Sequence, residues 1–206
     1  MTRNAQQDAD EDSDDVELLA EFRLLWRDAA AIWDEHENEP AFEGYVGSDF
    51  FAAWTILKSL RGRGSTFLEW GSGLGVVAIM ASRMGFESAG IEIEPELVEL
   101  AQTLAKRYSA DVDFVCGSFV PEEFEPDAAM GDEFFRTDSD SASAYAELDR
   151  ELSDFDIVYA YPWPDEQGLF NSIMRRCGGR RSVLIRYDNR EGISMRQPGM
   201  PKRSKR

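Results

Sequence analysis

The chain has 206 residues, 43% of them hydrophobic and 12% aromatic, which suffices for one domain whose core needs neither a disulfide nor a metal. Its two cysteines, Cys116 and Cys177, match no metal-ligand spacing, and the only histidine, His36, excludes a histidine-rich zinc site. No apolar run is long enough to span a membrane, and the first 15 residues lack a signal-peptide pattern. We therefore expect a soluble, cytoplasmic protein with reduced cysteines, no metal and no membrane partner.

The net charge of −18 is distributed unevenly along the chain. Residues 175–206 hold eleven basic and two acidic side chains, so residues 1–174, with the remaining 11 basic and 38 acidic ones, carry −27. An acidic body repels nucleic acid phosphates, and we therefore do not expect a nucleic acid partner. We expect residues 1–14 to be a disordered acidic tail and residues 191–206 to be a flexible basic tail.

Two helices are predicted within residues 15–62. Apolar residues recur at steps of three and four from Val16 to Trp33, which predicts an amphipathic helix that ends before "ENEP". A second helix is predicted to follow Ser48 or Asp49, either of which can cap its first turn, and to end at Gly62.

Strands and helices alternate over residues 63–190. We predict five strands, at 66–70, 88–93, 112–116, 156–160 and 182–187, with helices at 74–84 and 95–108 between the first three. The acidic, serine-rich segment 122–145 is long for a connection, and a helix at 144–152 would shorten its irregular part. The alternation predicts an α/β fold with a doubly wound, mostly parallel sheet and an N-terminal helical extension. Ligands bind such sheets outside the carboxyl ends of the strands.

A glycine-rich loop at the end of the first predicted strand is the main candidate for a ligand site. In "TFLEWGSGLG", Glu69 precedes three alternating glycines, Gly71, Gly73 and Gly75. Gly71 and Gly73 can adopt backbone angles closed to other residues and can let a ligand approach the main chain. We expect Gly75 to let the following helix pack closely on the strand.

An acidic residue at the end of the second strand indicates a binding site for a ribose. Glu92 lies 17 residues after Gly75, close to the spacing at which a carboxylate binds the ribose of a nucleotide cofactor. The carboxylate can accept hydrogen bonds from both ribose hydroxyls, and it would repel the 2′-phosphate of NADP. A dinucleotide-binding loop would carry a glycine where Val76 stands, which favours a cofactor without a pyrophosphate.

The sequence E-x-G-x-G-x-G, together with "GIEIEPELVELA", resembles motif I and the next strand and helix of the class I S-adenosylmethionine-dependent methyltransferases. The resemblance covers roughly Tyr45 to Tyr187 and implies a Rossmann-like methyltransferase fold with S-adenosylmethionine as the cofactor. It implies that the glycine loop contacts the methionine part of the cofactor, that Glu92 binds the ribose and that Glu69 lies near the amino group. The carried-over cofactor residues are therefore Glu69, Gly71, Gly73, Gly75 and Glu92.

Two features depart from that family. Many members carry an acid after the third strand that bonds the adenine amino group, where this chain has "CGSF". We expect Ser118 to accept a hydrogen bond there, and Phe119 either to lie on the adenine face or to belong to the core. The family also ends in a hairpin of two strands, whereas only one short strand, near 193–196, fits after Tyr187, so we expect an abbreviated sheet.

The segment "YAYPWPDE" stands where the family has its reaction site, at the end of the fourth strand. Members that methylate nucleobase amines carry Asn or Asp there, and this chain has Tyr161 instead, which disfavours base methylation. Aromatic faces and carbonyls held by a rigid proline turn stabilise an amine that becomes cationic. Tyr161 and Trp163 are therefore the candidate catalytic residues, unless they only close the top of the sheet. Asp165 and Glu166 are either a general base or the negative start of the next helix.

We predict an S-adenosylmethionine-dependent methyltransferase that acts on an amine of a small molecule or a protein. One alternative is an NAD-dependent oxidoreductase, which would have to tolerate Val76 in its phosphate turn. The other is a non-catalytic protein of the same fold that binds a partner through its N-terminal helix or its basic tail. The sequence identifies neither the methyl acceptor nor the oligomeric state.

Overall fold

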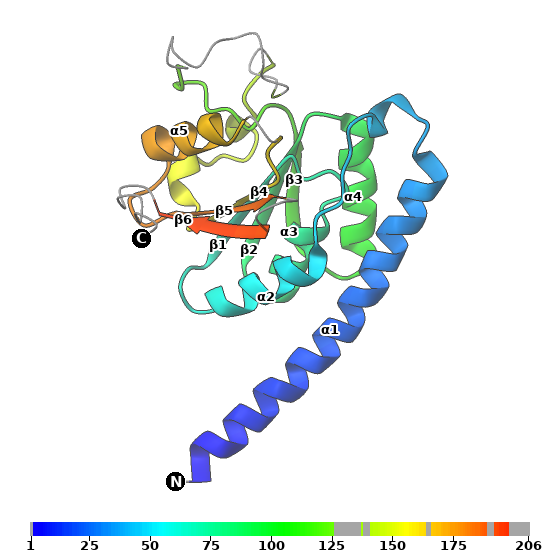
Figure 1. Cartoon of the computed structure of the whole chain (residues 1–206), viewed down its shortest axis with the longest axis vertical. Coiled ribbons are helices and arrows are strands. Elements are labelled where there is room, and N and C mark those ends of the chain that lie inside the picture. Colours follow the sequence, from blue (N-terminus) through cyan, green and yellow to red (C-terminus); the bar gives the residue numbers. More distant parts are fainter. Residues whose placement is uncertain (1, 126–136, 138–140, 164–165, 189–191, 198–206) are drawn as a thin grey trace. The chain divides into compact units, whose positions relative to one another are not determined.

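The computed structural model describes residues 2–125, 137, 141–163, 166–188 and 192–197 (Figure 1). The chain divides into two compact units, Met1–Gly44 and Tyr45–Arg206, which are described one at a time. No helix in the described ranges is both long and apolar enough to cross a membrane.

The first unit contains helix α1 (Thr2–His36) and the 3₁₀ turn η1 (Pro40–Phe42). The helix predicted between Val16 and Trp33 lies within α1, but α1 begins at Thr2, so most of the tail expected to be disordered is helical. The sequence explains the extension, because no proline or glycine interrupts it before Pro40. Beyond the helix, the ring of His36 stacks on Phe42 with the ring centroids 5.6 Å apart.

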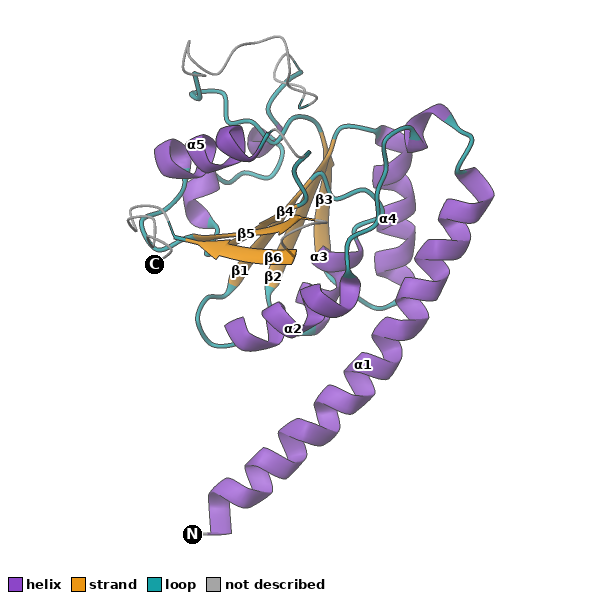
Figure 2. Ribbon diagram, viewed as in Figure 1, coloured by secondary structure: helices purple, strands orange, loops and turns teal. Residues whose placement is uncertain are grey.

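The second unit is built on a six-stranded sheet with the order β3-β2-β1-β4-β5-β6 (Figure 2). The strands are β1 (Thr66–Trp70), β2 (Glu87–Glu92), β3 (Val112–Cys116), β4 (Ile157–Ala160), β5 (Val183–Asp188) and β6 (Gly192–Arg196). Strands β1 to β5 are parallel, and β6 runs antiparallel to β5. All five predicted strands are present within one residue of the predicted bounds, and the single short strand expected after Tyr187 is β6.

Helices cover both faces of this sheet, as the doubly wound prediction requires. They are α2 (Phe50–Leu60), α3 (Val76–Arg83), α4 (Pro95–Arg107) and α5 (Gln167–Cys177). Helices α3 and α4 lie on one face and α5 lies on the other (Figure 1). The α2 helix begins as predicted, because the Asp49 carboxylate accepts a hydrogen bond of 2.9 Å from the Ala52 N–H.

Side chains of β1 alternate between the two faces of the sheet, as those of a strand must. Leu68 and Trp70 belong to the core that α5 covers, which also includes Phe170 and Ile173. The Phe67 side chain contacts Phe86, with ring centroids 6.4 Å apart, on the α3 side. The same alternation places the Glu69 carboxylate on the α3 side, where it bonds the first turn of α3.

The connection from β3 to β4 differs from the prediction. Instead of a helix over 144–152, it contains two 3₁₀ turns, η3 (Ala144–Ala146) and η4 (Leu152–Asp154). Asp149, between them, has a φ of +51°, which ends any right-handed helix. Tyr145 accepts a 2.9 Å hydrogen bond from the indole N–H of Trp70, so tertiary packing determines the course of this segment. Most of the acidic segment 122–145 lies outside the described residues.

Candidate functional site

The glycine loop joins β1 to α3 at the point where the strand order reverses, between β1 and β4. Gly71, Gly73 and Gly75 have φ angles of +62°, +52° and +69°, which L-residues rarely adopt. A Cβ at Gly73 would stand 2.5 Å from the Tyr45 ring, and one at Gly75 would stand 2.2 Å from the Phe114 ring. A Cβ at Gly71 would meet nothing within 4 Å. The rings of Tyr45 and Phe114 therefore fill the space beside Gly73 and Gly75, and of the three glycines only Gly71 faces open space.

The Glu92 carboxylate holds this loop against the end of β2. Its Oε2 accepts a 2.7 Å hydrogen bond from the Gly73 N–H. Its Oε1 accepts from the N–H groups of Ile93 and Glu94, at 2.7 and 3.2 Å. A carboxylate has about four acceptor positions, so roughly one remains on Oε2. Three of these positions are thus taken by backbone N–H groups, and the binding of ribose hydroxyls by Glu92 stays a prediction.

The Glu69 carboxylate caps helix α3. Gly75 occupies the N-cap position and has no side chain, and Glu69 Oε2 instead accepts a 2.8 Å hydrogen bond from the Ala78 N–H. The cap satisfies one of the unpaired N–H groups in the first turn and, when Glu69 is ionised, places a negative charge at the positive end of the helix dipole. The proximity of Glu69 to a cofactor amino group stays a prediction.

Burial raises the pKa of both carboxyl groups. Glu69 is 5% exposed, and burial raises its pKa to about 8, against the lowering effect of the Ala78 N–H and with a further increase from Glu92. Burial also raises the pKa of Glu92, which is 8% exposed, while three backbone N–H groups oppose the shift. Within the described ranges, neither carboxylate forms an ion pair with a lysine or arginine. A cation beside them would therefore be stabilised.

Tyr45 is the residue of this site that the sequence prediction did not include. Its ring lies against Gly73, and the pKa of its hydroxyl is raised by burial and then by the charges of Glu69 and Glu92. The segment before α2 gives no periodic signal, so only the folded chain brings Tyr45 to the loop.

Ser118 and Phe119 are engaged within the protein. Ser118 is buried, and its Oγ accepts a 3.2 Å hydrogen bond from the Val120 N–H. The ring of Phe119 stacks on Trp70, with centroids 5.0 Å apart and planes inclined by 17°, and also contacts Phe170 at 5.1 Å. Phe119 thus packs against the core, which was one of its two expected positions. The adenine contact of Ser118 stays a prediction.

The two candidate catalytic residues follow the carboxyl end of β4. Tyr161 and Trp163 are both half-buried, and their catalytic role stays a prediction. The Tyr161 ring lies edge-on to Tyr187, with centroids 5.0 Å apart and planes at 78°. The sequence analysis missed Tyr187, although the parallel pairing of Ala160 with Arg186 brings the next residues of β4 and β5 together. Pro164 and Asp165 lie outside the described residues.

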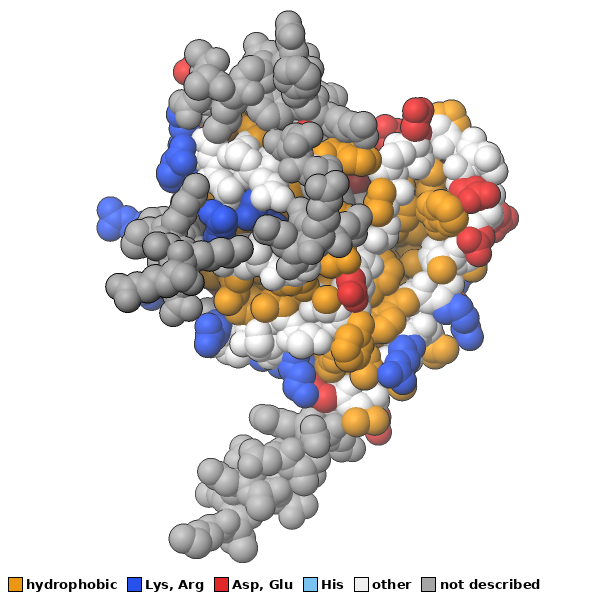
Figure 3. Space-filling view, viewed as in Figure 1, with side chains coloured by type: hydrophobic (Ala, Val, Ile, Leu, Met, Phe, Trp, Pro, Cys, Tyr) orange, Lys and Arg blue, Asp and Glu red, His pale blue; other side chains and the backbone are white. Residues whose placement is uncertain are grey.

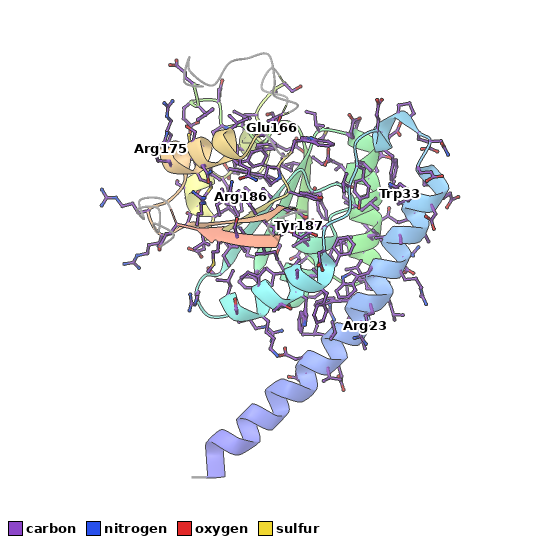
Figure 4. The ribbon with its side chains drawn as sticks, viewed as in Figure 1. Arg23, Trp33, Glu166, Arg175, Arg186 and Tyr187 are labelled. Carbon is purple, nitrogen blue, oxygen red and sulfur yellow. The ribbon has the colours of Figure 1, made fainter. Side chains whose placement is uncertain are left out.

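Glu166 is buried and hydrogen-bonded, and its role as a general base or as the negative start of α5 stays a prediction. It is 1% exposed and directly precedes α5, and its carboxylate accepts from the Thr137 N–H at 2.8 Å and the Thr137 hydroxyl at 3.0 Å. Arg186, 4% exposed, donates from Nη1 to the carbonyl and side-chain oxygens of Gln167, both at 3.4 Å. Figure 4 shows Glu166 at the start of α5 and Arg186 and Tyr187 on β5. Buried polar groups thus fix the beginning of α5 on the sheet.

Metal-binding groups were not expected, and the described residues contain no cluster of three or more His, Cys, Asp or Glu side chains. Cys116 and Cys177 are free thiols. The arrangement at the loop is therefore one of buried carboxylates, an open backbone position at Gly71 and aromatic rings.

Three solved structures illustrate what this chain is similar to. A protein from Pyrococcus horikoshii OT3 matches 65% of this chain with 20% identity and a TM-score of 0.44, and this chain spans 52% of its length. A hypothetical protein from Thermus thermophilus matches 68% of this chain with 20% identity and a TM-score of 0.49, and the match covers 72% of its own length. An RNA methyltransferase from Salinibacter ruber, in complex with S-adenosyl-L-homocysteine, matches 72%, with 16% identity, 94% of its own length and a TM-score of 0.47. The chain matches no protein-family model and no curated protein.

Proposed function

We propose that this chain is an S-adenosylmethionine-dependent methyltransferase whose acceptor is an amine of a small molecule or a protein. The observation that carries the proposal is the cap on α3. Glu69 occupies the helix N-terminus with a carboxylate, at the place where a dinucleotide-binding fold would hold a pyrophosphate. A pyrophosphate would meet a buried carboxyl group and an N–H group that is already hydrogen-bonded there, so an NAD-dependent reaction is disfavoured.

S-adenosylmethionine suits the same site because it brings positive charge rather than negative charge. The cofactor carries no phosphate, and its sulfonium and ammonium groups are cations. Glu69 and Glu92 are buried and form no ion pair with a lysine or arginine of the described chain, so a bound cation would lower the pKa of both groups and pair with the ionised carboxylates. Gly71 leaves backbone accessible, and the fourth acceptor position of Glu92 would take one ribose hydroxyl.

The cofactor supplies a methyl group bonded to a positively charged sulfur, and the protein has to present a neutral amine to it. Tyr161 and Tyr187 would place aromatic faces beside the acceptor, and Trp163 would do the same from the next turn of chain. Electron-rich ring faces favour the positive charge that the nitrogen acquires as it gains the methyl group. In this proposal these rings bind and orient the amine.

Calorimetric titration tests the cofactor proposal. The chain should bind S-adenosylmethionine and S-adenosylhomocysteine and should not bind NAD. Glu92→Ala should weaken binding of both sulfur compounds at least tenfold, because the ribose contact and the anchor of Gly73 are lost together. Glu94→Ala is the matched control, since Glu94 is the exposed acid two residues on. Binding of NAD alone, or equal losses in the two variants, would contradict the proposal.

Methyl transfer tests the acceptor. Radiolabelled S-adenosylmethionine would be offered with poly-L-lysine and with a set of small primary amines. Trp163→Ala should retain cofactor affinity and lose methyl transfer to the amine that the unmodified chain accepts. Retained transfer would refute the role of Trp163, and cofactor binding without transfer to any amine would favour the non-catalytic alternative.

A further inference from the structure

A second charged region lies at the opposite end of the sheet from the glycine loop. The last turn of α5, the turn before β5 and the end of β6 meet there, because Arg196 of β6 pairs with Leu184 near the start of β5. These elements carry five exposed arginines within 22 residues of sequence. We call this group the arginine corner; its members are Arg175, Arg176, Arg180, Arg181 and Arg196. Basic side chains are visible where α5 ends (Figure 3), and Arg175 is labelled there in Figure 4.

Four of the five guanidinium groups have no carboxylate partner in the described part of the chain. Arg175 donates to the Ser172 hydroxyl at 3.2 Å, and no ion pair joins it, Arg180, Arg181 or Arg196 to a described Asp or Glu. The fifth guanidinium group, that of Arg176, contacts another segment of the same chain. It donates to the backbone oxygen of Glu125 and lies 5.7 Å from the centroid of the Phe124 ring, in a stretch rich in acids.

Within the described residues, the absence of ion pairs at Arg175, Arg180, Arg181 and Arg196 is notable because the chain has 40 acidic residues against 22 basic ones. Like charges held close together on a surface repel one another, and an anionic partner relieves that repulsion. A long nucleic acid is disfavoured, because residues 1–174 carry −27 and would repel the phosphates on either side of the corner. A short acidic polypeptide segment is complementary to the corner in charge.

The chain itself contains such a segment. Between residues 8 and 17 seven of ten residues are Asp or Glu, and no Lys or Arg occurs between Arg3 and Arg23. This acidic segment is part of α1. Its charge is opposite in sign to that of the arginine corner.

We propose that the arginine corner binds the acidic segment, residues 8–17, of a second copy of this chain. The exchange is reciprocal: each copy offers its acidic segment to the corner of the other, which closes a symmetric pair. The inference does not depend on the proposed methyltransferase activity, because the corner lies at the other end of the sheet from the glycine loop.

The first test is sedimentation of the full chain at two salt concentrations. We expect self-association in 50 mM NaCl and dissociation in 500 mM NaCl, because exposed ion pairs are screened by salt. Replacing Arg180 and Arg181 by Glu, together with Arg175 and Arg196, should weaken association about 30-fold or more, since exposed pairs are individually weak but act together here. Replacing Lys106 and Arg107, at the exposed end of α4, by Glu is the control and should change association less than threefold.

A mixing experiment identifies the occupant. One chain carries the reversed corner, with its four free arginines replaced by Glu, and the other a reversed segment, with Asp10, Glu11, Asp12 and Asp14 replaced by Lys. Neither chain should associate with itself, whereas an equal mixture should form pairs, because both contacts are then complementary. Circular dichroism and cofactor titration of each variant separate loss of association from loss of folding.

Three results would overturn the proposal. One is a monomer in 50 mM NaCl at all accessible concentrations. Another is association that the corner variant and the Lys106/Arg107 control weaken equally, or that the mixture fails to restore. The third is a labelled 20-nucleotide RNA that binds the unmodified chain through the corner more tightly than a peptide of residues 1–20 does.

Discussion

Carboxyl groups at the two ends of the central sheet have pKa values that are shifted in opposite directions. At the carboxyl ends of the strands, burial raises the pKa of Glu69 to about 8 and also raises that of Glu92. At the other end, Asp156 precedes β4 and accepts hydrogen bonds from the N–H groups of Ser65 and Thr66, at 2.8 and 3.3 Å. The Ser65 N–H is the main cause that lowers the pKa of Asp156 below its usual range.

The difference separates a structural acid from a candidate site. Asp156 is close to solvent and is surrounded by donors, so its charge is compensated within the protein and ties the start of β1 to β4. Glu69 and Glu92 also accept backbone hydrogen bonds, but both are buried, and burial makes them easier to protonate than a free carboxyl group. Buried carboxyl groups at a strand switch point, which a bound cation would ionise, indicate a place for a cationic ligand.

The largest expected effect on stability comes from a substitution at one of two glycines with similar backbone angles. Gly75→Ala should lower the free energy of unfolding by about 4 kcal/mol, because the left-handed backbone is strained and the new Cβ would stand 2.2 Å from Phe114. Gly62→Ala, at the other end of the sheet, should cost only about 1 kcal/mol, since its φ is +75° but nothing lies within 4 Å. Urea denaturation measures both, and equal losses would contradict the close packing of α3.

The raised pKa of Glu69 predicts a pH-dependent stability. Between its usual pKa and about 8, the folded chain binds a proton that the unfolded chain has released, so the free energy of unfolding falls as pH rises through that window. Glu69→Gln stays neutral and should remove part of this fall, up to about 1.4 kcal/mol per pH unit. Denaturation at pH 5 to 9 measures the slope, with the exposed Glu96→Gln as control. Parallel curves for the variant and the unmodified chain would show that Glu69 is ionised in the folded state.

Asp156 should show the opposite dependence on pH. Its lowered pKa means that its contribution is present above the usual carboxyl pKa and is lost as the pH falls through the folded value. Asp156→Asn should therefore lower the free energy of unfolding by about 1.5 kcal/mol at pH 7 and by much less in acid. The exposed Asp113→Asn is the control. A loss that does not shrink on acidification would argue against the ionised role of Asp156.

The substitution with the smallest expected effect on stability should have a large effect on cofactor binding. Gly71→Ala should cost about 1 kcal/mol, as at Gly62, because a Cβ there meets no other group of the protein. The same methyl group would enter the space that the proposed cofactor occupies, so affinity for S-adenosylmethionine should fall at least tenfold. Calorimetry measures the affinity, and an unchanged value would place the ligand elsewhere.

Local patterns in the sequence predicted the strands within one residue, the cap of α2 and the single strand after Tyr187. Each of these depends on neighbouring residues: apolar runs bounded by turns, and a capping side chain before a helix. The glycine loop and Glu92 were also recognisable, because both depend on spacing along the chain.

Only the tertiary structure decided what the side chains at that edge do. The Glu69 carboxylate caps α3, Phe119 packs on Trp70, and Tyr161 meets Tyr187, each through contacts between elements far apart in sequence. Where a helix over 144–152 was predicted, Tyr145 instead accepts a hydrogen bond from Trp70, which is far away in sequence. The sequence by itself thus determined the strands and the position of the glycine loop, since these depend on short-range periodicity and spacing. Packing decided the partners of each charge and ring, because those depend on which distant segments the fold brings together.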